Sequence, residues 1–167
     1  KQRLARGLGR EAAHAVATAL LACTLEDLDD WAGPVVLSPA DAADLDWARA
    51  LLAARPGLHP RSCVVPQPEA NLGERLEAVD LELRGAGFDM LFFIGTDAPA
   101  LPRTLFATAL AALARADVVL APAHDGGVTL MGARRPWPAL AALPWSTATL
   151  GAALAAACAA RGDALQW

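Results

Sequence analysis

The sequence has few charged residues and no excess of positive charge, which excludes some classes of protein. Only 19% of its 167 residues are charged, and acidic residues outnumber basic ones 18 to 14, so the net charge is -4. A general nucleic-acid-binding protein needs clustered Lys and Arg to offset phosphate charge. We therefore expect no nucleic-acid partner, although a few local positive groups could still bind a small phosphorylated ligand.

Long apolar runs and cysteine clusters are also missing. No uninterrupted apolar run reaches the ~20 residues that a membrane helix needs, so no membrane span is expected. The three cysteines, Cys23, Cys63 and Cys158, lie far apart and form no Cys-x-x-Cys or Cys/His ligand group. We interpret them as reduced, mostly buried thiols. With no signal peptide visible in these residues, a cytoplasmic protein is expected.

The motifs of several common enzyme classes do not occur. The sequence has no Gly-x-Ser-x-Gly elbow, no P-loop and no Ser-His-Asp order. Its histidines form no spaced set of metal ligands. The absence of these motifs excludes the usual hydrolase and NTPase functions.

What the sequence does contain is an abundance of apolar residues in a regular order. Apolar residues make up 55% of the chain, enough to bury a core and to exclude disorder. One domain, residues 1–167, is expected at this length. Short apolar strands alternate with helices, which predicts an α/β fold, a three-layer sandwich with a mostly parallel sheet. Strands are expected at residues 35–37, 63–65, 90–94, 118–120, 128–133 and 165–167, and helices at 13–23, 41–52, 71–83, 102–113 and 147–160.

Asp97 follows the most apolar of the predicted strands. In sheets of this kind, ligands bind beyond the carboxyl ends of the strands. A carboxylate there could hold Mg²⁺ or Mn²⁺, which prefer oxygen ligands and bridge phosphate oxygens. A turn or cap aspartate before the helix at Pro102 is the alternative.

The run Asp125-Gly126-Gly127 follows the strand at 118–120. Two adjacent glycines let a backbone approach a ligand closely, and Asp125 could face the same ligand. An ordinary hairpin, for which Asp-Gly is the usual signal, is the alternative that the motif alone favours.

Positive charge gathers at the start of the chain. Lys1 and Arg3 precede the first predicted helix. They could bind a diphosphate, with Arg3 in a bidentate geometry. A solvated basic end is the simpler interpretation.

The segment before the last predicted helix carries a tryptophan and two hydroxyl groups. Ser146 or Thr147 is expected to cap that helix. Trp145 could wall a sugar or base pocket, but a Trp beside a Pro more often packs at an edge.

Together, five motifs in order resemble those of the bacterial DUF2064 family. They are residues 1–5 (KQRLA), 71–76 (NLGERL), 95–99 (GTDAP), 121–127 (APAHDGG) and 144–147 (PWST). The resemblance spans essentially the whole chain. It implies a glycosyltransferase-like protein with the nucleotide-diphospho-sugar transferase fold, GT-A type.

The resemblance also has departures. Members of the family usually begin with an apolar strand and a Pro/Gly-rich loop before a Lys-x-Arg-Leu motif, whereas this chain opens at that motif, so the first strand is expected to be missing. The family tends to have an acidic residue where His124 stands and an aromatic residue where Val128 stands. These differences imply an altered substrate preference or a reduced activity.

The function implied by the resemblance is a metal-dependent transferase that uses a nucleotide-activated donor, above all a nucleotide sugar, and an unknown acceptor. The cofactor would be Mg²⁺ or Mn²⁺. The implied roles are metal ligand for Asp97, diphosphate binding for Lys1 and Arg3, catalysis for Asp125, and substrate contact for Gly126, Gly127, Trp145 and Ser146.

Two other functions stay open at this point. One is a nucleotidyltransferase that releases pyrophosphate from an NTP, as in the guanylyltransferases of molybdenum-cofactor and F420 synthesis that the family resembles. The other is a non-catalytic nucleotide-binding or partner module. A homodimer also remains open.

Overall fold

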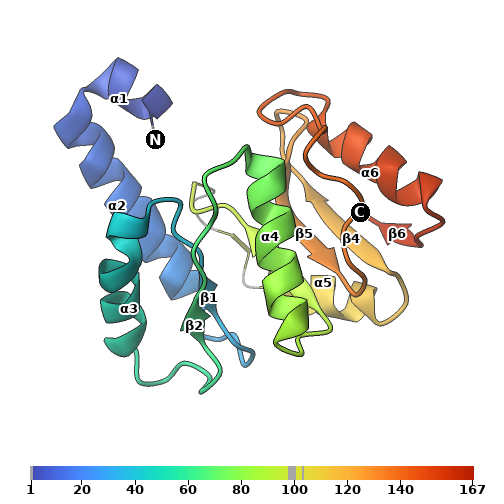
Figure 1. The fold of residues 1–167 in the computed structure, drawn as a ribbon, viewed down its shortest axis with the longest axis horizontal. Coiled ribbons are helices and arrows are strands. Elements are labelled where there is room, and N and C mark those ends of the chain that lie inside the picture. The colour runs from blue at the N-terminus through green and yellow to red at the C-terminus, as the bar shows by residue number, and fades with distance from the viewer. Residues whose placement is uncertain (1, 98–100, 103) are drawn as a thin grey trace.

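The computed structural model describes residues 2–97, 101–102 and 104–167, which form an α/β fold (Figure 1). The elements in chain order are α1 (Gln2–Leu8), α2 (Arg10–Asp27), β1 (Val36–Leu37), the 3-10 turn η1 (Ala42–Asp44), α3 (Leu45–Ala53), β2 (Cys63–Val64), α4 (Leu72–Gly85), β3 (Leu91–Ile94), α5 (Thr104–Leu113), β4 (Val118–Pro122), β5 (Val128–Ala133), α6 (Leu150–Ala160) and β6 (Leu165–Gln166). Within these ranges, no helix combines the length and the hydropathy that crossing a membrane requires.

Four strands form the main sheet in the order β3-β5-β4-β6. β3 and β4 both pair antiparallel with β5, and β6 pairs parallel with β4. β3, β4 and β6 therefore run in one direction, as a mostly parallel sheet requires, and β5 runs against them. The reversal of β5 follows from its connection, because the turn at 123–127 is far too short for the crossover that a parallel neighbour needs.

β1 and β2 form a separate parallel pair within the described part of the chain, so the expected sheet is divided in two. An apolar cluster links the pair to the main sheet through α4. Its buried members are Val65, Val79, Leu83 and Leu91. Side-chain packing, rather than a hydrogen-bonded ladder, therefore joins the two sheets here.

Helices cover both faces of the main sheet. Val118 and Leu120 of β4 pack in one core with Leu154 and Cys158 of α6. Val119, which lies between them in sequence, packs in a second core with α5. This alternation is the period of a strand that is buried on both faces. The three-layer arrangement predicted from the sequence is confirmed.

α4 begins where the sequence predicts, after Asn71. The Asn71 side chain accepts a hydrogen bond from the Glu74 backbone N–H at 3.0 Å, and the Glu74 carboxylate accepts one from the Asn71 N–H at 2.9 Å. This capping box satisfies two N–H groups that would otherwise lack partners. Inside the first turn, a Cβ on Gly73 would lie 2.2 Å from the carbonyl oxygen of Leu140. Because residue 73 is a glycine, α4 can pack closely against the loop that follows β5.

α6 begins at Leu150, later than predicted. The residue before it, Thr149, makes no side-chain cap. The Thr147 hydroxyl instead donates to the Pro144 carbonyl at 2.7 Å and accepts from the Thr149 N–H at 3.3 Å. The prediction that Ser146 or Thr147 caps this helix is therefore wrong, because the Thr147 hydroxyl closes the turn before it.

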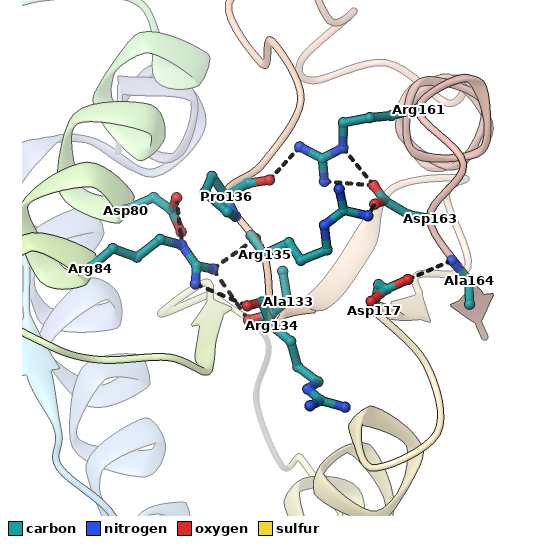
Figure 2. Close-up of polar contacts among 10 residues, drawn as sticks. All are labelled: Asp80, Arg84, Asp117, Ala133, Arg134, Arg135, Pro136, Arg161, Asp163 and Ala164. Atoms are coloured by element: carbon teal, nitrogen blue, oxygen red, sulfur yellow. Dashed lines mark hydrogen bonds and ion pairs between the residues drawn. The ribbon is translucent and has the colours of Figure 1, made fainter.

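Arginine–aspartate pairs fasten the edge of the sheet where β3 and β4 begin (Figure 2). Arg84 of α4 bonds Asp80 at 3.0 Å and also donates to the backbone carbonyls of residues 89, 133, 134 and 135. The fully buried carboxylate of Asp163 accepts from Arg135 at 2.9 Å and from Arg161 at 2.8 Å. These contacts hold together the loops at this edge.

The cysteines match the sequence prediction only in part. Cys158 is buried and Cys63 is partly buried, but Cys23 is exposed on α2. The prediction of buried thiols is thus wrong for Cys23. Burial raises the pKa of Cys158 to about 11, and burial also raises the pKa of Cys63.

Candidate functional site

The edge of the main sheet opposite the ion pairs carries two aspartates. Ile94 of β3 and Ala121 of β4 both lie opposite Leu130 of β5, and the two strands run in the same direction. Their carboxyl ends therefore meet at one edge, on either side of β5. Asp97 follows the end of β3 and Asp125 follows the end of β4, so the fold places the two predicted site carboxylates at this same edge.

Asp97 is exposed directly after β3. A Cβ on Gly95 would lie 2.6 Å from its Oδ1 atom, so the carboxylate lies over a backbone position that has no side chain. An exposed carboxylate at a strand end is a suitable oxygen donor for a hard cation. Its alternative role, as a cap before Pro102, depends on residues 98–100, which lie outside the described part.

Leu101 is held from a distant part of the chain. Asp27, the last residue of α2, accepts a hydrogen bond from the Leu101 N–H at 3.1 Å. Nearby, Trp31 packs edge-on against Phe92 of β3, with ring centroids 5.9 Å apart. The sequence alone does not reveal this support, because no local motif marks an aspartate whose partner is so far away along the chain.

Asp125 lies in a hairpin turn between β4 and β5. The Ala123 N–H bonds the Gly127 carbonyl at 3.0 Å, and the Gly126 N–H bonds the Ala123 carbonyl at 3.1 Å. The Asp125 carboxylate accepts from the Gly127 N–H at 3.0 Å. The backbone thus forms the hairpin that the sequence left open as an alternative. The Asp125 side chain stays exposed on it, as does His124.

Gly126 has a structural reason to be glycine. Its φ is +84°, a value that residues with side chains rarely adopt. A Cβ there would lie 2.0 Å from the Ala148 carbonyl oxygen. At Gly127 a Cβ would lie 3.1 Å from the Asp125 carboxylate. The close approach at Gly126 is thus to the loop before α6, and a contact of either glycine with substrate stays a prediction.

Trp145 and Ser146 lie in that same loop. The Trp145 indole N–H donates to the Leu140 carbonyl at 2.8 Å, and its ring packs, half-buried, on the core between the sheet and α6. Ser146 is exposed, with a φ of +65°. Such a conformation costs about 1–3 kcal/mol in a residue with a side chain. Since residue 148 touches Gly126, the loop of Ser146 adjoins the turn of Asp125.

The remaining predicted site residues lie at the start of the chain. Lys1 falls outside the described residues, and so does the side chain of Arg3, whose backbone belongs to α1. Among the side chains that the structure does describe, no group of three or more His, Cys, Asp or Glu residues could hold a metal ion. Two surface hollows, one beside α4 and Trp137 and one where α1 meets α2, include neither Asp97 nor Asp125.

Comparisons with known proteins agree with this architecture. The sequence model of one family, described as "Uncharacterized protein conserved in bacteria (DUF2064)", matches residues 14–147. A crystal structure of a "putative nucleotide-diphospho-sugar transferase" from Desulfovibrio desulfuricans G20 is similar, with a TM-score of 0.78 and 23% sequence identity over 98% of this chain and 71% of that one. Among curated proteins, no sequence matches this chain significantly. The structural similarity shows the nucleotide-diphospho-sugar transferase fold predicted from the sequence.

Proposed function

The chain belongs to the DUF2064 family, and from that premise we propose that it is a metal-dependent transferase which uses a nucleotide-activated donor, above all a nucleotide sugar. One observation carries the proposal. Two exposed carboxylates, Asp97 and Asp125, follow strands on either side of β5 at one edge of the sheet. Ligands bind at such edges in α/β folds. The structural neighbour from D. desulfuricans supports the fold that this proposal needs.

The described residues fit a divalent cation that is shared with the donor. Asp97 offers one exposed carboxylate, and the side chains that the structure describes form no larger group of His, Cys, Asp or Glu ligands. Mg²⁺ is commonly bound by one or two carboxylates together with substrate phosphates, so the remaining ligands would come from the diphosphate and water. When bound, the ion would neutralise negative charge on the departing nucleoside diphosphate.

The other site residues would act on the two substrates. Asp125 would orient an acceptor hydroxyl and accept its proton as a general base. Lys1 and Arg3 would add positive charge beside the diphosphate. Gly127, Trp145 and Ser146 would line the side of the site formed by the turn and the loop before α6.

A thermal-shift panel tests this proposal. We expect UDP or GDP, or their sugar conjugates, to raise the melting temperature in the presence of Mn²⁺ and much less in its absence, because a ligand that binds only the folded state stabilises it. If no nucleotide stabilises the protein with Mn²⁺ present, the proposal is wrong. Release of pyrophosphate from GTP or CTP would instead identify a nucleotidyltransferase.

A further inference from the structure

The turn that carries Asp125 is joined to the start of α6 by a hydrogen bond between backbone atoms. The Gly126 carbonyl accepts a hydrogen bond from the Gly151 N–H at 3.0 Å. On the other side of this contact, a Cβ on Gly151 would lie 3.1 Å from the Gly126 carbonyl oxygen and 3.2 Å from that of Gly127. A methyl group on Gly151 would therefore press against the carbonyls of Gly126 and Gly127, and one on Gly126 would overlap the carbonyl of Ala148, just before α6.

The steric demand at Gly126 is separate from its backbone conformation. Gly87 and Gly162 have nearly the same φ, +84° and +81°, yet a Cβ at either would meet nothing within 4 Å. At Gly126 the Cβ would instead overlap the Ala148 carbonyl, which is backbone and cannot rotate away. The left-handed conformation is thus shared by several glycines, whereas the close contact with another segment belongs to Gly126.

Asp125 is linked to this contact through the turn. Asp125 is adjacent to Gly126, and its carboxylate is bonded to the Gly127 N–H, so it moves with the turn. The loop on the opposite side carries Ser146, whose hydroxyl is exposed, and Trp145, whose ring is fixed to the core. Any displacement of the turn from α6 would shift the carboxylate relative to both residues.

We propose that Gly126 is a positioning residue: with Gly151, it locks the Asp125 turn to the loop before α6, so that the two segments act as one wall of the site. The role of this wall in turnover rests on the proposed transferase function. The lock itself is a property of the ligand-free protein and can be tested without any substrate.

The lock is tested by ¹⁵N NMR on the whole chain. The Gly127 amide reports the bond to Asp125, and the Gly151 amide reports the bond to Gly126. We expect Gly126→Ala and Gly151→Ala each to shift both amides and to speed their hydrogen exchange by about tenfold or more. Gly87→Ala, the control with the same φ, should leave both amides unchanged.

If Gly126→Ala does not fold, the smaller perturbation in Gly151→Ala tests the inference by itself. A Gly127 amide that is unmoved in Gly151→Ala would overturn the inference.

A second measurement separates positioning from general damage. With UDP-glucose and GDP-mannose as probes, we expect the glycine variants to release nucleoside diphosphate about tenfold more slowly or worse, because small misplacements of catalytic groups are costly. Affinity for UDP and GDP with Mn²⁺ should stay at the wild-type value, because Asp97 lies on a different loop. Equal loss of affinity and turnover would contradict a positioning role. A wild-type protein that releases neither nucleotide contradicts the proposed function, and the amide shifts then still decide whether the lock exists.

Discussion

Asp97 and Asp125 differ from the buried aspartates of this protein in their surroundings. Asp80 and Asp163 are buried, and each is paired with arginine, Asp163 with two of them. Their charge is used within the fold, because a buried charge needs such partners. Asp97 and Asp125 are exposed at the ends of strands, where a carboxylate can meet a ligand. The two proposed site carboxylates thus differ from Asp80 and Asp163 in their exposure to solvent.

Replacing Asp163 by Asn should destabilise the protein by about 1.5–3 kcal/mol, because the buried carboxylate loses its charged hydrogen bonds to Arg135 and Arg161, which are themselves partly exposed. Urea unfolding measures the change. Asp46→Asn is the matched control. Asp46 also pairs with an arginine, but its side chain is 95% exposed, so the loss there should stay below about 1 kcal/mol. Equal losses in the two variants would show that the buried network contributes nothing beyond an ordinary surface pair.

Cys158 should make stability depend on alkaline pH. Burial, followed by the nearby charge of Asp163, raises its pKa from 9.0 to about 11, with Arg161 acting in the opposite direction. Below pH 9 both states keep the proton. Between pH 9 and 11 the unfolded thiol ionises first, so stability falls as pH rises, by an amount on the order of 2 kcal/mol.

Chemical unfolding at several pH values between 8 and 11 would measure this slope. Other groups contribute little to the pH dependence of stability here, because the chain has no tyrosine that titrates in the same range. Cys158→Ala should flatten most of the slope, whereas Cys23→Ala, at an exposed thiol, should leave it intact. A slope that is the same in wild type and Cys158→Ala would rule out this origin.

Among the helices, α4 depends on a close backbone approach. Its Gly73 lies against residues 140 and 141, and its Glu77 carboxylate accepts hydrogen bonds from the N–H groups of Leu140 and Ala141. Gly73→Ala would force a methyl group into backbone atoms that side-chain rotation cannot relieve. We expect a loss of about 1–3 kcal/mol in the free energy of unfolding, the usual cost of overpacking.

The same helix supplies the control. Gly85, at the end of α4, has no atom within 4 Å of the position that a Cβ would take. Gly85→Ala should therefore be neutral, or stabilising by up to about 1 kcal/mol, since alanine favours a helix more than glycine does. The explanation fails if the two variants change the midpoint of thermal unfolding by the same amount.

Local sequence signals predicted some elements well and others poorly. The capping box at Asn71 and Glu74 uses only neighbouring residues, so the sequence alone could place the start of α4. The start of α6 could not be placed in the same way, because Thr147 offers its hydroxyl to the preceding turn instead of to the helix. A hydroxyl before a helix is ambiguous until the path of the loop is known.

For the protein as a whole, the order of strands and helices predicted the layers but not every strand direction. The apolar run at β4 indicated a buried strand, and the two cores confirm this. β3 contacts both cores as well, but it is the last strand of the four-stranded sheet and its residues after Leu91 are only partly buried. The division between the two sheets and the hydrogen bond that the Leu101 N–H donates to Asp27 both depend on segments far apart in the sequence, so no local pattern reveals them. Likewise, the sequence indicated Asp97 and Asp125 separately, and only the register of β5 puts them at one edge.

The most direct test of the proposed site is calorimetric titration of UDP and GDP into the protein in the presence of Mn²⁺, with wild type, Asp97→Asn and the exposed control Asp46→Asn compared. We predict that binding needs Mn²⁺ and that Asp97→Asn weakens it by about tenfold or more, which corresponds to ~1.4 kcal/mol, while its circular dichroism stays that of the wild type. Asp46→Asn should bind like wild type. Nucleotide binding that persists without metal, or that is equally tight in Asp97→Asn, would contradict the account.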